Sequence, residues 1–244
     1  MSPEHSFELS AFLRSLFLII SAGVYTAILG LPAFVSCLLD RSGHWPSIFQ
    51  RIWVHWLLRT NGIRLRLRGI ENLKQGQSYI LVSNHASLLD IPGIISAFPF
   101  AVRFLAKKSL LRIPVFGWYL YLSGHILIER DSVKSALKGL KRASSALQQG
   151  ISVIVFPEGT RSLDGEVKEF KGGAFLLAQN SKSPLVPIGI SGSFEMLPRT
   201  GWCFRPGIMH IRIGEPISTR DLSPQESRNL MGTVRHTIIQ SLKA

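Results

Sequence analysis

The sequence has 244 residues, of which 46% are hydrophobic and 18% are charged, enough to bury one sizeable core with a small appendage. Lys and Arg number 28 against 15 Asp and Glu, so the net charge of +13 favours an anionic partner such as nucleic acid, lipid head groups or a phosphorylated substrate. Only Cys37 and Cys203 occur, far apart and outside any Cys/His cluster, which argues against a disulfide framework and a zinc site.

The N-terminal part of the chain indicates a membrane. Residues 15–39 contain no Asp, Glu, Lys or Arg, and about 20 apolar residues suffice to cross a hydrocarbon core. A cleaved signal peptide is the competing interpretation. The run is longer than the usual apolar region of such a peptide, and its front flank carries Glu4 and Glu8 with only Arg14. We therefore predict a retained membrane segment.

An aromatic segment follows this run after Gly30 and Pro32, which we expect to interrupt it. On a helix, its aromatic residues fall on one face and its cations on the other, as in a helix that lies in the membrane interface; they are Trp45, Phe49, Trp53 and Trp56 against Arg51, His55 and Arg59. A helical hairpin in one leaflet and a single full span both stay open, as does a buried helix packed on a soluble core. If the chain spans, its basic residues place the remainder in the cytoplasm. We assign residues 1–62 to a membrane-anchoring helical segment and residues 63–244 to one further domain.

Strand and helix patterns alternate through the rest of the chain. The helix at 132–149 has Asp131 or Ser132 as a candidate N-cap and Gly150 as C-cap, and the last helix begins with the capping box of Ser223 and Glu226. The apolar patterns predict strands at 63–68, 79–83, 126–128, 151–156, 185–190 and 209–213, and helices at 91–98, 132–149, 172–180 and from 223 onward. This alternation predicts an α/β fold in which helices cover a mostly parallel central sheet.

Two candidate site segments directly follow predicted buried strands. In sheets of this type, ligands bind at the ends of the strands, where the chain turns into loops. In the first, His85 follows the strand at 79–83 and Asp90 stands five residues later. A carboxylate at that spacing can fold back, fix the imidazole tautomer and stabilise the imidazolium that forms when His85 takes a proton. A structural histidine is the alternative for this pair taken alone. Ser87 lacks the glycine-flanked elbow of a hydrolase nucleophile, so we regard it as a cap or spectator.

The second segment, residues 156–162, follows the strand at 151–156. Gly159 permits a tight turn close to a ligand, Thr160 supplies a hydroxyl, and the Arg161 guanidinium suits a phosphate. Glu158 can hold Arg161 or accept a hydrogen bond from a substrate hydroxyl. A connecting loop with a surface ion pair is the alternative for Glu158 and Arg161 alone.

Together these segments resemble the glycerolipid acyltransferase family of lysophosphatidate acyltransferases. The resemblance rests on four blocks in the family's order, at residues 84–90, 124–130, 156–162 and 186–188, and it extends from about residue 68 to residue 217. Glu129 stands where Asp is frequent and Arg199 where Lys is frequent, and both changes keep the charge.

The resemblance implies that His85 deprotonates the acceptor hydroxyl, which attacks an acyl thioester directly, while Asp90 orients the imidazole. It also implies that Arg130, Arg161 and Lys107 bind the acceptor phosphate, with Lys108 a less favoured contact. The product would be phosphatidic acid, made on the cytoplasmic side of a bacterial inner membrane. No metal or redox cofactor is expected.

The expected partners are lysophosphatidic acid, membrane lipids and an acyl donor that is either acyl coenzyme A or an acidic acyl carrier protein. Another acceptor, such as lyso-ornithine lipid, a lysophospholipid or glycerol 3-phosphate, stays open because pocket shape decides it. A nucleic-acid-binding module is disfavoured, since the cations are spread along the chain without the interleaved aromatic residues that stack on bases. The other histidines, including His125, have no convergent partners in the sequence, and we assign them no role.

Overall fold

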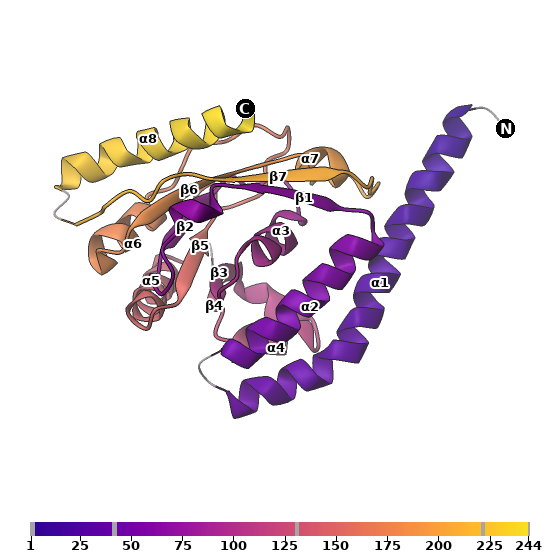
Figure 1. The fold of residues 1–244 in the computed structure, drawn as a ribbon, viewed down its shortest axis with the longest axis horizontal. Helices are drawn as coiled ribbons and strands as arrows, with labels where there is room; N and C mark the ends of the chain where they lie inside the picture. The colour runs from indigo at the N-terminus through magenta and orange to yellow at the C-terminus, as the bar shows by residue number, and fades with distance from the viewer. Residues whose placement is uncertain (1–2, 41–42, 130–131, 221–222, 244) are drawn as a thin grey trace.

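Helices cover both sides of one central sheet in the computed structural model, which describes residues 3–40, 43–129, 132–220 and 223–243. Figure 1 shows α5, α6 and α8 on one side of the sheet and α1 to α4 on the other. The predicted fold class is confirmed. The proposed domain boundary at residue 62 stays a prediction. Helix α2 (His44–Thr60) supplies Val54 and Leu58 to the core beneath the sheet, so the N-terminal segment packs on the rest of the chain.

The N-terminal segment forms a helical hairpin of α1 (Pro3–Leu39) and α2. The Trp53 indole Nε1 donates to Thr26 Oγ1 at 3.1 Å, and the Asn61 amide donates to Ser21 Oγ at 3.0 Å, so polar contacts fix the two helices side by side. Among the described helices, one stretch, Leu9–Leu39, is long and apolar enough to cross a membrane. Its outer surface is apolar, with side chains such as Phe12 and Leu31 exposed.

The expected interruption at Gly30 and Pro32 is wrong, because α1 continues through both residues. It bends toward its C-terminal end instead (Figure 1), as a proline inside a helix requires. Gly30 lets the loop before α4 approach closely, since a Cβ there would lie 2.9 Å from Val115 Cγ1. In α2, Trp45 and Trp56 are exposed while Val54 is buried. Trp53 packs against the core, so the four aromatic residues do not share one exposed face. The helix is packed on the core on one side, and its proposed position in the membrane interface stays a prediction.

The sheet has seven strands in the order β1-β7-β6-β2-β5-β3-β4, and only the β6–β7 pair is antiparallel. The strands are β1 (Arg64–Arg68), β2 (Ile80–Ser83), β3 (Val102–Lys107), β4 (Ile126–Ile128), β5 (Ser152–Val155), β6 (Leu185–Ser191) and β7 (Ile208–Ile213). Helical elements between them are η1 (Ile70–Asn72), α3 (Asp90–Ala97), η2 (Lys108–Arg112), α4 (Phe116–Leu122), α5 (Val133–Gln148), α6 (Gly173–Ser181), α7 (Ser193–Met196) and α8 (Pro224–Lys243). Because β2, β5, β3 and β4 are parallel neighbours, their carboxyl ends meet at one edge of the sheet.

Strand β3 is absent from the predicted elements because Arg103 breaks its apolar pattern. The side chain is only 7% exposed, and burial lowers the pKa of its guanidinium. Nearby, the backbone N–H of Phe104 donates to Nδ1 of His125 at 3.1 Å, and burial together with Arg103 lowers the pKa of His125 to about 3. His125 thus has partners that the sequence did not reveal, and it holds β3 against the segment before β4.

A second core lies on the other side of the sheet, beneath α5, α6 and α8. Helix α8 buries Val234 and Ile238 completely, in agreement with the apolar spacing of its sequence. At its start the Ser223 hydroxyl accepts from the Glu226 N–H, and Glu226 accepts from the Ser223 N–H. This is the predicted capping box.

The burial of α8 gives a stability prediction. Replacing Ile238 by Ala removes side-chain atoms from a fully buried position and should lower the free energy of unfolding by about 2–5 kcal/mol. Urea or thermal unfolding of the detergent-solubilised protein measures this loss. The exposed Gln240→Ala on the same helix is the matched control, and equal stability losses in the two variants would contradict the packing described for α8.

Candidate active site

A buried carboxylate holds the imidazole of His85 at the carboxyl end of β2. Asp90 is the first residue of α3 and is 0% exposed. Its Oδ2 lies 2.8 Å from Nδ1 of His85 and also accepts the backbone N–H groups of Ala86 and Ser87, each at 2.8 Å. Because an ionised carboxylate only accepts hydrogen bonds, Nδ1 carries the proton and Nε2 is left as the basic nitrogen.

The segment around His85 is also tied to the sheet. The side chain of Asn84 makes two hydrogen bonds with the backbone of Ile190, much as a neighbouring strand would. Its amide donates to the Ile190 carbonyl and its Oδ1 accepts from the Ile190 N–H, both at 2.9 Å. The Ser87 hydroxyl donates to the Leu197 carbonyl at 2.7 Å. A serine hydroxyl engaged in this way fits the interpretation of Ser87 as a structural residue.

Glu158 braces the backbone. Of the two roles that the sequence left open, an ion pair with Arg161 does not form among the described residues, and a contact with a substrate hydroxyl stays a prediction. Oε1 of Glu158 accepts the N–H of His85 at 2.7 Å, and its Oε2 accepts the N–H of Lys168 at 3.1 Å. Burial raises the pKa of this carboxyl, while the two backbone N–H groups act in the opposite direction. Glu158 therefore connects the His85 segment to the strand-end loop at residues 158–162.

That loop meets the His85 segment directly. The Ser162 N–H donates to the His85 carbonyl at 2.8 Å, and Gly159 adopts the left-handed φ of +73° that its turn needs. The ring of Phe156 stacks on the imidazole of His85 with centroids 4.1 Å apart. The sequence gave no role to Phe156. Its position offered a signal, because Val155 pairs with Val82 and the residues that follow both strands must lie side by side.

Two guanidinium groups gather at the outer side of this loop. Arg199 donates through Nη1 to Thr160 Oγ1 at 2.9 Å and to the Arg161 carbonyl at 2.8 Å. Burial and the neighbouring Arg199 lower the pKa of Arg161. In the described part of the chain, neither arginine has a carboxylate within ion-pair distance. This concentration of positive charge suits an anionic ligand.

The remaining predicted ligands lie farther along the same edge of the sheet. Lys107 ends β3 and is exposed, whereas Lys108 pairs with Glu129 at 2.7 Å, so Lys107 is the freer cation of the two. Arg130 lies outside the described residues, and its proposed role stays a prediction. The structure thus brings together His85, Asp90, Glu158, Gly159, Thr160 and Arg161, with Lys107 two strand positions away from β2.

Comparison with known proteins defines the class of this chain. Residues 64–191, more than half of the sequence, match the family model described as Acyltransferase. The matched region contains the His85–Asp90 pair and the loop at residues 158–162. Fold and sequence together therefore define an acyltransferase.

Individual relatives define more closely which acyltransferase family the chain belongs to. The chain is 33% identical over 236 residues to the 1-acyl-sn-glycerol-3-phosphate acyltransferase of Saccharomyces cerevisiae, covering 95% of this chain and 77% of that protein. It is 34% identical over 172 residues to the enzyme of the same name from Pseudomonas aeruginosa, covering 70% and 66%. The protein belongs to the family of 1-acyl-sn-glycerol-3-phosphate acyltransferases.

A solved structure supports the same assignment over nearly the whole chain. The 1-acyl-sn-glycerophosphate acyltransferase PlsC from Thermotoga maritima superposes with a TM-score of 0.81 at 28% identity, covering 97% of this chain and 96% of that one. This coverage includes most of the N-terminal hairpin. In a chain of this family, the exposed apolar surface of α1 indicates association with a membrane.

The buried position of Glu158 gives a prediction about pH. Burial raises its pKa above the ordinary 4.5, so the native state keeps the proton at pH values where the unfolded chain has lost it. The stabilising contribution is full below pH 4.5 and is lost as the pH rises through the raised pKa. Glu158→Gln cannot titrate, so the free energy of unfolding of the wild type minus that of the variant should fall as the pH increases.

Urea unfolding at a series of pH values measures this difference. The exposed Glu166→Gln is the matched control and should show no such trend. A difference that rises with pH would mean that the native environment favours the charged carboxylate, contrary to the burial of Glu158.

Proposed function

We propose that this protein transfers a fatty acyl chain from a thioester donor to the free hydroxyl of 1-acyl-sn-glycerol 3-phosphate, giving phosphatidic acid. The observation that carries the proposal is the 2.8 Å contact between His85 Nδ1 and Asp90 Oδ2 beside the Arg161 loop. It presents a basic Nε2 next to cations that suit the acceptor phosphate. The names of the relatives in yeast, animals, plants and bacteria supply the acceptor.

The transfer itself needs one base and no covalent acyl-enzyme. His85 Nε2 removes the proton from the acceptor hydroxyl as its oxygen attacks the thioester carbonyl, and Asp90 stabilises the imidazolium that forms. The tetrahedral intermediate then expels the thiolate, which receives that proton. The products are an ester and a free thiol. A metal or cofactor has no step in this scheme.

The phosphate of the acceptor would lie against Arg161, with Thr160 and Gly159 shaping the loop and Lys107, at the end of β3, on the same edge of the sheet. Arg130, which lies outside the described residues, is kept as a further proposed contact. Arg161 is partly buried and lies beside Arg199. A phosphate there would relieve the repulsion between the two guanidinium groups, which favours a bidentate, charge-assisted contact. We place this site on the cytoplasmic side of the membrane, a bacterial inner membrane in our proposal, with α1 and α2 in contact with lipid.

Removal of the base gives the first functional prediction. His85→Ala should lower kcat by a factor of about 10²–10⁴ with little change in the KM for lysophosphatidic acid, because the phosphate contacts remain. Asp90→Asn should also reduce kcat, since its amide cannot stabilise an imidazolium. The measurement is phosphatidic acid formation from purified protein in detergent micelles. Near wild-type transfer by His85→Ala would remove the proposed mechanism.

The phosphate contact gives a second prediction. Arg161→Ala should raise the KM for the acceptor by about tenfold or more, in line with the loss of a charge-assisted pair, and Arg161→Lys should recover part of it. Arg68→Ala, on the far strand β1, is the matched control and should leave this KM unchanged. An unaltered KM in Arg161→Ala would assign the phosphate to other cations.

The choice of acceptor is tested with competing substrates. Wild-type protein is supplied in parallel with lysophosphatidic acid, lyso-ornithine lipid, a lysophospholipid and glycerol 3-phosphate, each with the same acyl donor. The proposal expects the highest kcat/KM for lysophosphatidic acid. A higher value for any other acceptor would keep the chemistry and change the substrate.

A further inference from the structure

Helix α5 carries a concentrated positive charge that the proposed reaction does not use. Its sequence contains Lys134, Lys138, Lys141 and Arg142 and no acidic residue. The three lysines are exposed, and within the described residues none has a carboxylate at ion-pair distance. An uncompensated row of lysines at helical spacing attracts a complementary acidic surface.

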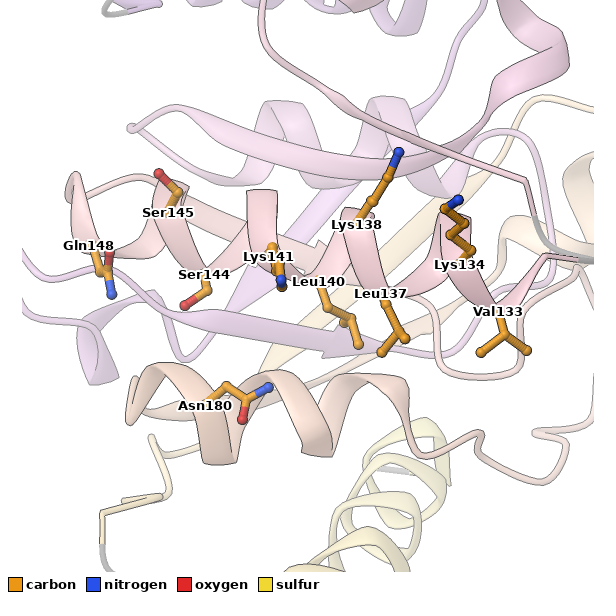
Figure 2. Close-up of a pocket in the computed structure, with 10 residues that line it drawn as sticks. All are labelled: Val133, Lys134, Leu137, Lys138, Leu140, Lys141, Ser144, Ser145, Gln148 and Asn180. Atoms are coloured by element: carbon orange, nitrogen blue, oxygen red, sulfur yellow. The ribbon is translucent and has the colours of Figure 1, made fainter.

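A groove with both apolar and polar lining runs along these lysines. It has a volume of about 720 Å³ and follows α5, with Asn180 of α6 at one end. Its α5 lining consists of the three lysines, the apolar Val133, Leu137 and Leu140, and the polar Ser144, Ser145 and Gln148. Figure 2 shows Leu137 and Leu140 pointing toward α6, the helix that carries Asn180, while Lys134 and Lys138 point the other way. Val133 is 77% exposed and Leu137 is 49% exposed. Apolar residues beside a row of cations suit an amphipathic acidic helix laid along the groove.

The groove is on the side of the sheet that faces away from the membrane helices. Helix α5 packs with α6 over the core opposite α2 and α3 (Figure 1). The apolar surface of α1 and the groove on α5 therefore belong to opposite sides of the sheet. This placement favours an occupant that arrives from the aqueous side.

The start of the groove is close to the active site. Helix α5 begins beside the carboxyl end of β4, where the Glu129 N–H donates to Ser135 Oγ at 2.8 Å. Strand β4 is three positions from β2 in the sheet order, a separation of about 14 Å at ~4.8 Å per strand, so the start of α5 and His85 lie at the same edge of the sheet. A flexible pantetheine arm can bridge such a separation while the protein that carries it stays bound to α5.

We propose that α5, with Lys134, Lys138 and Lys141 beside Val133 and Leu137, is the docking surface for an acyl carrier protein. Such a carrier is a small acidic helical protein that holds the acyl chain as a thioester on a phosphopantetheine arm. Its acidic helix lies along the groove, and the arm reaches along the sheet edge to His85. This inference rests on the proposed function, because it names the donor of the same reaction.

The decisive experiment compares two donors that carry the same acyl chain. Kinetics with acyl carrier protein and with acyl coenzyme A are measured at saturating lysophosphatidic acid for the wild type and for Lys134→Glu/Lys138→Glu/Lys141→Glu. The triple variant should raise the KM for the acylated carrier protein by about tenfold or more, as expected for reversed interface charges, while kcat/KM with acyl coenzyme A stays within about twofold. The coenzyme A activity shows that the variant is folded.

Arg64→Glu/Arg66→Glu/Arg68→Glu is the matched control, because it makes the same charge change on the exposed edge strand β1. This control should not discriminate between the donors. Leu137→Asp should raise the KM for the carrier protein alone, since it puts an acidic group into the groove.

Three results would overturn the inference. They are a triple variant that uses the carrier protein as well as the wild type does, an equal loss in the β1 control, and a wild type that accepts only coenzyme A. A triple variant that loses binding to anionic vesicles with unchanged carrier-protein kinetics would assign α5 to a membrane instead. The proposed function fails separately, if the wild type makes phosphatidic acid from neither donor.

Discussion

One oxygen atom organises the active site of this protein. Oδ2 of Asp90 accepts hydrogen bonds from the imidazole of His85 and from two successive backbone N–H groups, in a position closed to solvent. The same contacts therefore fold the turn after β2 and choose the histidine tautomer. A residue that replaced Asp90 without accepting these bonds would leave buried N–H groups unsatisfied as well as an unoriented base.

Further hydrogen bonds fix the His85 turn relative to the loop at residues 158–162 and to β6. Glu158 accepts from the His85 backbone, Ser162 donates back to it, and Asn84 joins the turn to β6. A few buried hydrogen bonds thus join chain segments that are distant in sequence. They fix the loop at residues 158–162 relative to His85. In the proposed mechanism, such positioning lets a transfer between two bound substrates proceed without a covalent intermediate.

Much of the fold and the central pair of the site could be predicted from the sequence, because they depend on local sequence patterns. Apolar runs placed six of the seven strands, and the spacing of His85 and Asp90 placed the central pair. Two of the misses, β3 and the partners of Glu158, have a common physical cause, since both depend on contacts across the fold. Strand β3 was not predicted because the buried Arg103 resembles a surface position in the sequence. The bracing role of Glu158 was not among the roles considered for it, because its partners, the N–H groups of His85 and Lys168, could not be read from its neighbours in the sequence.

The most direct test of this account is the protonation of His85 itself. Nitrogen NMR of histidine-labelled protein, with the His85 signals assigned by comparison with His85→Gln, reports which ring nitrogen carries the proton. The account predicts a neutral ring with the proton on Nδ1, held by Asp90, and a free Nε2 at the pH where the enzyme is active. A proton on Nε2 under those conditions would contradict it, because the nitrogen that faces the acceptor could not then act as the base.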